Sequence, residues 1–412
     1  MSDATRAAHG GFTLDDLRRS PNALASCYSR FRVADRLLLT GHSHQAWPDA
    51  GFDGQLAAWI DAAELVDDKW PRAEAQADRV RSGYARWLGA DAGAIAPQIA
   101  LGASTHELVV RFLSALPLDR RPRLVTTDGE FHTVRRQLDR LAETGRIEVM
   151  KLAAEPAATL AERLAAAVDD RTAAVLVSSV LFGSAHIVPN LAATLAACGR
   201  VGAELLVDAY HQLNVVPFSL EQGGLGDAFV TGGGYKYAQL GEGNAFLRVP
   251  PGRDALRPVV TGWFSEFTRL SDKTSGVPYG EGAARWAGAT YDPTSHYRAA
   301  RVFEFFDVHD LEPEFLRTVS RHQVGLLARS FDALDLDPAL IARDRATPLE
   351  HIAGFLALRA PRAAELSFRL RERGVRIDHR GEVLRLGPAP YLSDGQLESA
   401  IAALGEVTRQ TL

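Results

Sequence analysis

Short apolar runs alternate with amphipathic segments between about residues 95 and 250. The amphipathic segments predict helices at 105–116, 130–144, 157–168 and 190–201. The apolar runs predict strands at Arg123–Thr127, Ile147–Lys151, Ala173–Ser178, Glu204–Asp208, Ala228–Thr231 and Ala245–Val249. This alternation favours a mostly parallel sheet with helices on both faces. Only a glycine-rich turn separates the last two runs, which allows an antiparallel neighbour in the sheet.

The rest of the chain has a different pattern. Residues 250–295 lack periodicity and are rich in Gly, Pro, Ser and Thr, so we expect an excursion or linker there. After it we predict helices at 296–307, 311–334, 361–373 and 394–411, an apolar run at 351–358, and short strands near 375–379 and 383–387. We therefore predict a large α/β domain at 56–295 and a smaller α+β domain at 296–412. Residues 1–55 would complete the small domain or cover the functional site.

The composition is that of a globular protein, because 46% of the 412 residues are hydrophobic and 24% are charged. The net charge of -5 provides no positive field for nucleic acid or an anionic membrane. The most apolar stretch, 172–185, is shorter than the roughly 20 residues that span a bilayer, and the polar N-terminal residues do not resemble a signal peptide. Two cysteines are too few for a disulfide framework, so we expect a cytoplasmic protein.

The strongest local signal links a strand end to a glycine-rich turn. Val207–His211 is followed by Gly232–Tyr237, in which three glycines precede Tyr235 and Lys236. Asp208 closes its strand, at the edge of an α/β sheet where ligands bind. A carboxylate there is costly to bury without a cation, and the protonated pyridine nitrogen of pyridoxal phosphate is one such cation. Lys236 would then supply the Schiff-base amine, and the glycines would let the backbone approach the ligand.

Lysine is scarce in this chain, which narrows the search for that amine. Four of the 46 basic residues are lysines and 42 are arginines, a bias that a coding preference explains. Lys69, Lys151 and Lys273 have no glycine-rich approach. Taken singly, an Asp at a strand end is more often a helix cap, and a Lys between tyrosines is more often a surface residue. Their combination in this order favours the cofactor.

The same region resembles a known family. Asp208-x-x-His211, Val216-Pro217, Tyr235-Lys236-Tyr237 and Gly241-x-Gly243 are similar to the kynureninase branch of the fold-type I, class V aminotransferase-like enzymes, which depend on pyridoxal phosphate. Other segments that resemble this family are Gly102-Ala-Ser104-Thr105 before a helix, Gly262-Trp263-Phe264, Asp378-His-Arg380, and Leu384 to Pro390 with Arg385.

The resemblance implies a seven-stranded, mostly parallel sheet and a homodimer that acts on a small-molecule amino acid. It implies Lys236 as the Schiff-base lysine, Asp208 as the pyridinium partner and His211 as its neighbour at the ring. The other residues that it implies are Ser104, Thr105 and Tyr235 near the phosphate, Arg385 at the substrate α-carboxylate, and Trp263 and Thr290 across the subunit interface. An arginine suits a carboxylate because it donates two parallel hydrogen bonds. Tyr235 or a histidine would donate a proton.

Several positions depart from the kynureninase pattern. The entry loop is Gly41-His42-Ser43-His44-Gln45, and we expect His42 and His44 to contact the substrate. Gly129-Glu130-Phe131-His132 is closer to the Glu-His-His segment of cysteine desulfurases, so Phe131 or His132 would stack on the ring. Ser265-Glu266 and Gly288-Ala289-Thr290 also differ. Because these positions touch substrate more than cofactor, the reaction stays open between hydrolytic Cβ–Cγ cleavage, C–S lyase or desulfurase chemistry, and transamination.

Two alternatives belong to other classes. His42-x-His44 follows an apolar run, a spacing that can place two imidazoles on one metal. Glu130, His132, Asp208 and His211 would then complete the site of a metal-dependent hydrolase, although two unrelated loop histidines explain the same spacing. The other alternative is a binding protein that holds the cofactor and converts no amino acid. A desulfurase also needs a mobile thiol, whereas Cys27 and Cys198 lie in the N-terminal segment and in a predicted helix.

Overall fold

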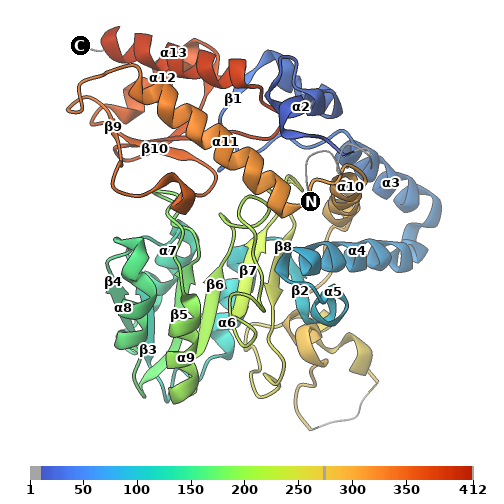
Figure 1. The fold of residues 1–412 in the computed structure, drawn as a ribbon. Helices are drawn as coiled ribbons and strands as arrows, with labels where there is room; N and C mark the ends of the chain where they lie inside the picture. The colour runs from blue at the N-terminus through green and yellow to red at the C-terminus, as the bar shows by residue number, and fades with distance from the viewer. Residues whose placement is uncertain (1–10, 272–274, 411–412) are drawn as a thin grey trace.

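The computed structural model describes residues 11–271 and 275–410. Its centre is a seven-stranded sheet of order β2-β8-β7-β6-β5-β3-β4 (Figure 1). Its strands are β2 Ile99–Gly102, β3 Arg123–Thr127, β4 Glu148–Leu152, β5 Thr172–Ser178, β6 Glu204–Asp208, β7 Phe229–Gly233 and β8 Ala245–Arg248. β3 to β7 pair in parallel, and β8 runs antiparallel to β7 and β2. The predicted fold class and the predicted antiparallel neighbour, β8, are confirmed. Residues 1–10 of the predicted N-terminal part, Lys273 and residue 411 lie outside the described residues.

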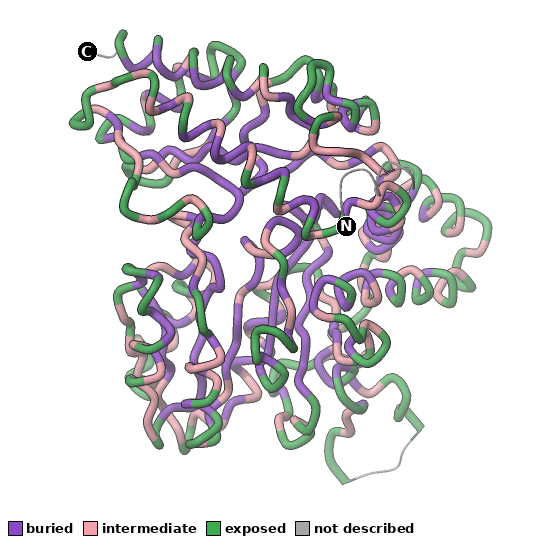
Figure 2. Tube along the Cα trace, in the orientation of Figure 1, coloured by how far each residue is buried: buried purple, intermediate pink, exposed green. Residues whose placement is uncertain are grey.

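The central strands β5 and β7 are buried along their whole length because both faces of the sheet are covered (Figure 2). In β6, Leu205 and Val207 belong to one core cluster and Leu206 belongs to the other. Helices α8 (Leu160–Ala167) and α9 (Leu191–Val201) pack in the first cluster, whereas α6 (Thr105–Ala115) and α7 (His132–Ala142) pack in the second. Continuous apolar runs are what parallel strands buried on both faces require.

β2 is the strand of the seven-stranded sheet that the sequence pattern missed. It has four residues and pairs only with β8, at the edge of the sheet. A run of four residues is too short to show a period of two. By contrast, β3 and β6 have the predicted bounds, and the other predicted strands of this sheet are displaced by one or two residues.

The C-terminal part is a smaller α+β unit, as predicted. Its antiparallel sheet has the order β12-β13-β10-β9, with β9 Ala342–Arg343, β10 Leu356–Arg359, β12 Asp378–Arg380 and β13 Val383–Leu386. Its helices are α11 Pro313–Asp332, α12 Ala363–Glu372 and α13 Asp394–Gln410, at the top of Figure 1. Helix α10, Thr294–Val308, instead packs against α3 (Ala50–Leu65) and α4 (Trp70–Leu88). The excursion before α10 contains two 3-10 helices, Trp263–Arg269 and Gly282–Trp286.

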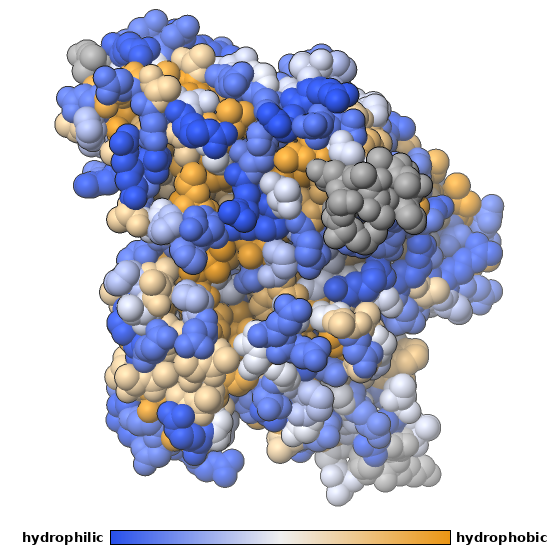
Figure 3. Space-filling view, viewed as in Figure 1, coloured by the Kyte–Doolittle hydropathy of each residue, from blue (hydrophilic) through white to orange (hydrophobic). Residues whose placement is uncertain are grey.

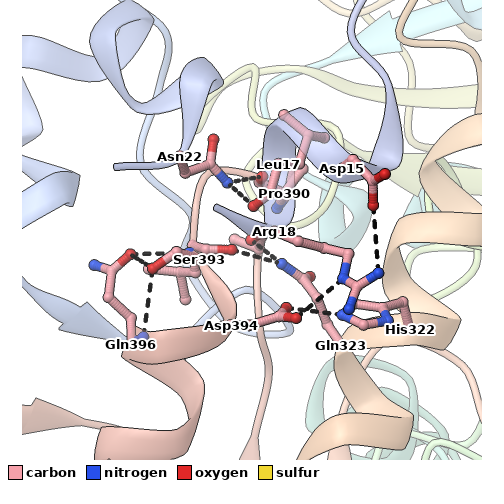
Figure 4. Close-up of polar contacts among 12 residues, drawn as sticks. Asp15, Leu17, Arg18, Asn22, His322, Gln323, Pro390, Ser393, Asp394 and Gln396 are labelled. Carbon is pink, nitrogen blue, oxygen red and sulfur yellow. Dashed lines mark hydrogen bonds and ion pairs between the residues drawn. The ribbon is translucent and has the colours of Figure 1, made fainter. Parts of the chain in front are cut away.

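The N-terminal segment is attached to this C-terminal part. Strand β1, Leu37–Leu38, pairs in parallel with β11, Val375–Arg376. Beyond helix α2 (Leu14–Arg18), the buried Asn22 side chain donates to the Leu17 and Pro390 carbonyls, at 2.6 and 2.9 Å (Figure 4). Figure 4 also shows Arg18 and His322 converging on Asp394, the first residue of α13. The boundaries at residues 55 and 295 stay a prediction.

Gly83 allows α4 to approach α10 closely. A Cβ at this position would lie 2.5 Å from ring atoms of the buried Phe303. We expect Gly83→Ala to lower the free energy of unfolding by about 1–3 kcal/mol, because overpacking outweighs the better helix propensity of Ala. Gly93→Ala in α5 (Ala92–Ile95) is the matched control, since its nearest neighbour is 3.6 Å away. Urea unfolding of both variants measures the difference, and equal midpoints would contradict the prediction.

Candidate functional site

A cavity lies where the carboxyl ends of β5, β6 and β7 meet. The residues that line it are Thr105, Val109, Phe131, Thr133, Val134, Ser178, Val180, Phe182, Asp208, Tyr210, His211, Tyr235 and Lys236. In the space-filling view, apolar residues gather in the hollow between the C-terminal part and the sheet (Figure 3). The structure therefore brings six of the residues singled out from the sequence to one place: Thr105, Phe131, Asp208, His211, Tyr235 and Lys236.

Lys236 is buried at the centre of this site. Its Nζ lies 2.8 Å from Nε2 of His211. The rings of Tyr210, Phe131 and Tyr235 surround the amine, with centroids at 4.4, 5.2 and 5.8 Å from Nζ. Burial lowers the pKa of Lys236 to about 7, although the Asp208 charge opposes this shift. An amine that loses its proton near neutral pH is a nucleophile and a base.

Asp208 lies at the carboxyl end of β6, in register with Ser178 on β5 and Thr231 on β7. Burial raises the pKa of Asp208, while the backbone N–H of Tyr210, which donates to Oδ1 at 2.9 Å, opposes that rise. A carboxylate in this position gains most from a cationic partner. The site thus offers a place for a positively charged group beside Asp208.

The glycines before Tyr235 lie close to other atoms of the protein. A Cβ at Gly233 would lie 2.6 Å from the Tyr210 hydroxyl oxygen, and one at Gly232 would lie 2.8 Å from the Leu213 side chain. At Gly234 the nearest atom would be Cβ of Leu240, also at 2.8 Å. These glycines make room for neighbouring protein atoms. That they also let the backbone approach a ligand stays a prediction.

His211 is neutral in this environment. Burial, followed by the Lys236 charge, lowers the pKa of His211 well below its ordinary value. Its Nδ1 is buried and has no hydrogen-bond partner among the described residues. Since Nε2 faces the Lys236 amine, His211 can exchange a proton with that amine.

At the start of α6, Thr105 and Ser104 differ in position. Thr105 lines the cavity. Ser104 is exposed and caps the helix, because its hydroxyl oxygen accepts from the Glu107 N–H at 3.3 Å. The N-terminus of this 11-residue helix suits an anion. Thr105 and the helix end therefore face the cavity, while the Ser104 side chain does not line it.

Phe131 and His132 also point differently. Phe131 lines the cavity, with Lys236 Nζ 5.2 Å from its ring centroid. His132 is exposed, and its ring contacts Phe182 at 5.6 Å. Of the two residues proposed to stack on a ring, Phe131 is the one that the structure places beside Lys236.

Arg385 is paired within the protein. It is 3% exposed and donates from Nε and Nη2 to Asp378, the first of these at 2.9 Å. Its Nη1 donates to the Phe182 carbonyl at 2.8 Å. The same Asp378 carboxylate accepts from Nε2 of His42 at 2.7 Å. Nε and Nη2 of Arg385, which could bind a substrate carboxylate, thus already bind the carboxylate of Asp378.

The two entry-loop histidines lie in different surroundings. His42 is fully buried, and burial lowers its pKa to about 4, so the ring is neutral. His44 is exposed and stacks on Tyr235, with ring centroids 4.8 Å apart. The expectation that both contact a substrate therefore fits His44, next to a cavity residue, better than His42, which is bonded to Asp378.

The metal-hydrolase alternative has no support from this arrangement. Glu130 is buried and accepts from the hydroxyls of Thr127 and Ser178, both at 2.6 Å. Burial raises the pKa of Glu130 to about 7. Over residues 11–271 and 275–410, no three His, Cys, Asp or Glu side chains are grouped so that they could hold a metal ion. The His42 and His44 side chains make separate contacts, with Asp378 and with Tyr235.

Trp263 and Thr290 do not line the Lys236 cavity of their own chain. Both are exposed. Thr290 lies in a separate surface depression that it shares with Gly102 and Ala103, just before α6. Within one chain the structure does not bring these two residues to the site.

Sequence reasoning missed Tyr210, Phe182 and Asp378 as parts of the site. Tyr210 and Asp378 stand inside the motifs that carried the resemblance, beside recognised positions, so the spacing contained a usable signal. Phe182 lies in the segment after β5, where nothing in the pattern marks it.

No family model matches the chain. A curated kynureninase from Deinococcus radiodurans is 28% identical over 362 residues, which cover 85% of this chain and 82% of that protein.

Similar solved structures include a mutant of the cystine C–S lyase C-DES, with glycine covalently linked to its PLP cofactor. Its TM-score is 0.79 and its sequence identity is 14%, and the match covers 92% of this chain and 98% of that one. A cysteine desulfurase from Escherichia coli has a TM-score of 0.75 and 14% identity, over 97% of this chain and 99% of that one. At sequence identities this low, the similarity shows the fold alone. The chain is therefore similar in sequence to a kynureninase and shares the fold of these PLP-containing structures.

Proposed function

We propose that this chain is a pyridoxal phosphate-dependent enzyme that acts on an amino acid, by kynureninase-like hydrolytic Cβ–Cγ cleavage or related lyase chemistry. The observation that carries the proposal is the buried Lys236, whose amine lies 2.8 Å from His211 and whose pKa is lowered to about 7. A buried lysine among aromatic rings and a strand-end aspartate has the reactivity that an aldehyde cofactor requires.

The residues of the cavity fit this cofactor. Lys236 would bond to its aldehyde carbon, and Asp208 would keep the proton on its ring nitrogen. Phe131 would lie against the ring face, and Thr105 with the α6 N-terminus would receive the phosphate, near Tyr235. When bound, the cofactor supplies an electron-poor ring that takes up electron density from the substrate Cα.

The chain's own groups can move the protons that the reaction needs. The Lys236 amine would remove the proton at Cα of a bound amino acid, and His211 would share that proton through Nε2. Burial raises the pKa of Tyr235, so its hydroxyl keeps a proton to donate to the substrate side chain. Tyr210, whose pKa burial raises even further, stays an uncharged wall of the cavity.

A desulfurase-type reaction would need a reactive thiolate, which neither cysteine offers. Cys198 is buried in α9, and burial raises its pKa to about 12. Burial also raises the pKa of the half-buried Cys27. Transamination and β-elimination need no thiol, so they stay as alternatives to Cβ–Cγ hydrolysis.

A spectral screen with product identification tests the proposal. The purified protein, incubated with pyridoxal phosphate, should show an absorbance that borohydride bleaches. A panel that includes kynurenine and cysteine derivatives should then perturb this absorbance. Alanine together with an aromatic acid would identify Cβ–Cγ hydrolysis, whereas pyruvate would identify β-elimination. Protein that takes up no cofactor would overturn the proposal, and bound cofactor without turnover of any amino acid would favour a binding protein.

The pH dependence of cofactor uptake should report the protonation state of the Lys236 amine. Because the pKa of Lys236 is lowered to about 7, the reactive neutral amine accumulates as the pH rises through 7 and dominates above it. The rate at which apoprotein gains the borohydride-sensitive absorbance should therefore level off by about pH 8. A rate that still rises tenfold between pH 8 and 9 would indicate a lysine with an ordinary pKa.

We also propose a homodimer in which Trp263 and Thr290 lie at the subunit interface. Large apolar side chains are exposed on α3 and on the excursion, including Trp59 at 77% and Val259 at 81%. Exposed apolar patches of this kind mark interaction surfaces. Sedimentation velocity should give twice the monomer mass, and Trp59→Ser with Val259→Ser should shift the equilibrium toward monomer.

A cytoplasmic location is proposed from the cysteines. Cys27 and Cys198 are both free, which suits a reducing compartment. Within the described ranges, no helix is both long enough and apolar enough to cross a membrane.

A further inference from the structure

Asp378 is contacted by three side chains from two ends of the chain. Arg385, on β13, donates to it from Nε and Nη2. Arg380, on the same strand β12 as Asp378, has Nη2 3.4 Å from Oδ2. His42, from the N-terminal loop, lies 2.7 Å from Oδ1. The Asp378 carboxylate thus contacts two guanidinium groups and one neutral imidazole.

Arg385 and Arg380 differ in how firmly the protein holds them. Nε, Nη1 and Nη2 of Arg385 all donate to protein oxygens, which fixes its orientation. The Arg380 side chain is 46% exposed and makes a longer ion pair with Asp378. Its charge still acts at the cavity: it opposes the rise that burial causes in the pKa of Tyr235, and it adds to the larger effect of burial in lowering the pKa of Lys236. Nη1 of Arg380 donates to the carbonyl of the adjacent His379 at 2.9 Å, so protein oxygens hold fewer donors of the exposed Arg380 than of the buried Arg385. Arg380 can therefore turn toward a ligand, while Arg385 supplies a fixed charge.

The charges of this cluster leave one positive charge unmatched. Arg385 and Arg380 carry two positive charges, Asp378 carries one negative charge, and His42 is neutral. Lys236 and Asp208, which line the cavity, would be engaged by the cofactor. The cavity wall includes Phe131 and Phe182. The ring of the buried Phe355 lies 5.6 Å from the Arg385 guanidinium carbon. These rings offer no cation to a second carboxylate.

We propose that Asp378 sets the charge of the substrate site, so that the site favours amino acids with one carboxylate and an uncharged side chain over dicarboxylic ones. This inference rests on the proposed function, since it takes the cavity to be where an amino acid binds. Asp378 is a positioning residue here, because it acts through Arg385 and Arg380. A neutral residue in its place would leave two positive charges, and a second carboxylate would then be attracted.

The test compares two simple carboxylates, 3-phenylpropionate and succinate, by calorimetric titration of the cofactor-loaded protein. The wild-type protein should prefer 3-phenylpropionate. Asp378→Asn should shift the ratio of the two Kd values toward succinate by about tenfold, the effect of one charge in a half-buried site. Glu382→Gln is the matched control, because it removes a carboxylate from the same β12–β13 turn, where Glu382 is 56% exposed and pairs with Arg359. It should leave the ratio unchanged.

A second variant keeps the test decisive if Asp378→Asn does not fold. Arg380→Gln alters an exposed side chain and lowers the net charge of the cluster to zero, so 3-phenylpropionate should bind about tenfold more weakly. An unchanged ratio in Asp378→Asn, or unchanged binding in Arg380→Gln, would overturn the inference. Neither measurement requires turnover, and the cofactor absorbance is recorded separately. Failure of the charge rule is therefore distinguishable from failure of the proposed function.

Discussion

Lys236→Ala is expected to abolish the borohydride-sensitive absorbance of the cofactor-loaded protein and to lower kcat by roughly 10²–10⁴-fold, the usual contribution of a positioned proton-transfer group. The substitution removes both the amine that would bond to the cofactor and the base that would act at Cα. Lys236 is 5% exposed, and Ala fits its space without a buried charge, so the fold should be retained. Absorbance spectra before and after borohydride, together with turnover of the amino acid found in the screen, measure the two effects.

Lys151→Ala is the matched control for this experiment. Lys151 lies on β4 and pairs with Asp139 on the surface, away from the cavity-lining residues. The control should keep both the absorbance and the activity. If Lys236→Ala keeps the reducible absorbance, another amine holds the cofactor and the assignment of Lys236 is wrong.

Asp208→Asn is expected to lower kcat by roughly 10²–10³-fold, the loss that follows when one preorganised electrostatic group is removed. Without the carboxylate, the ring nitrogen would not hold its proton, and the ring would take up electron density less well. A second effect separates this role from a structural one. Because the Asp208 charge raises the pKa of Lys236, its loss should lower that pKa further and move the pH dependence of cofactor uptake to lower pH.

Asp170→Asn provides the control, since Asp170 is exposed just before β5. It should change neither kcat nor the pH dependence. If Asp208→Asn lowers activity and leaves the pH dependence of uptake in place, Asp208 does not act on Lys236 through its charge, and its assigned position beside the cofactor would have to be revised.

The sequence predicted the central sheet well because its signals are local. Both faces of β3 and β6 are covered, so each strand is a continuous apolar run with clear ends. The edge strand β2 has one partner and four residues, and it left no such run. The residues from Asp208 to Lys236 were found for the same reason: parallel strands end at one edge, so neighbours in the sheet share a site.

Other features of the site depend on tertiary contacts that no local pattern contains. Ser104 and Thr105 are adjacent, but the Ser104 side chain caps α6 through Glu107, whereas Thr105 lines the cavity. Phe131 and His132 are also adjacent: α7 begins at His132, and Phe131, just before it, lines the cavity. The pairing of Arg385 with Asp378 joins neighbouring strands, but the hydrogen bond between His42 and Asp378 joins residues from opposite ends of the chain.

That link has a consequence for the order in which the protein can mature during synthesis. His42 and Asp378 are 336 positions apart. The seven-stranded sheet ends at Arg248, so it can form on the ribosome while β12 has not yet been translated. The carboxylate cluster can close only after Asp378 and Arg385 have emerged. A nascent chain would therefore contain Lys236 before it contains the carboxylate cluster that we propose to set the preference for a substrate.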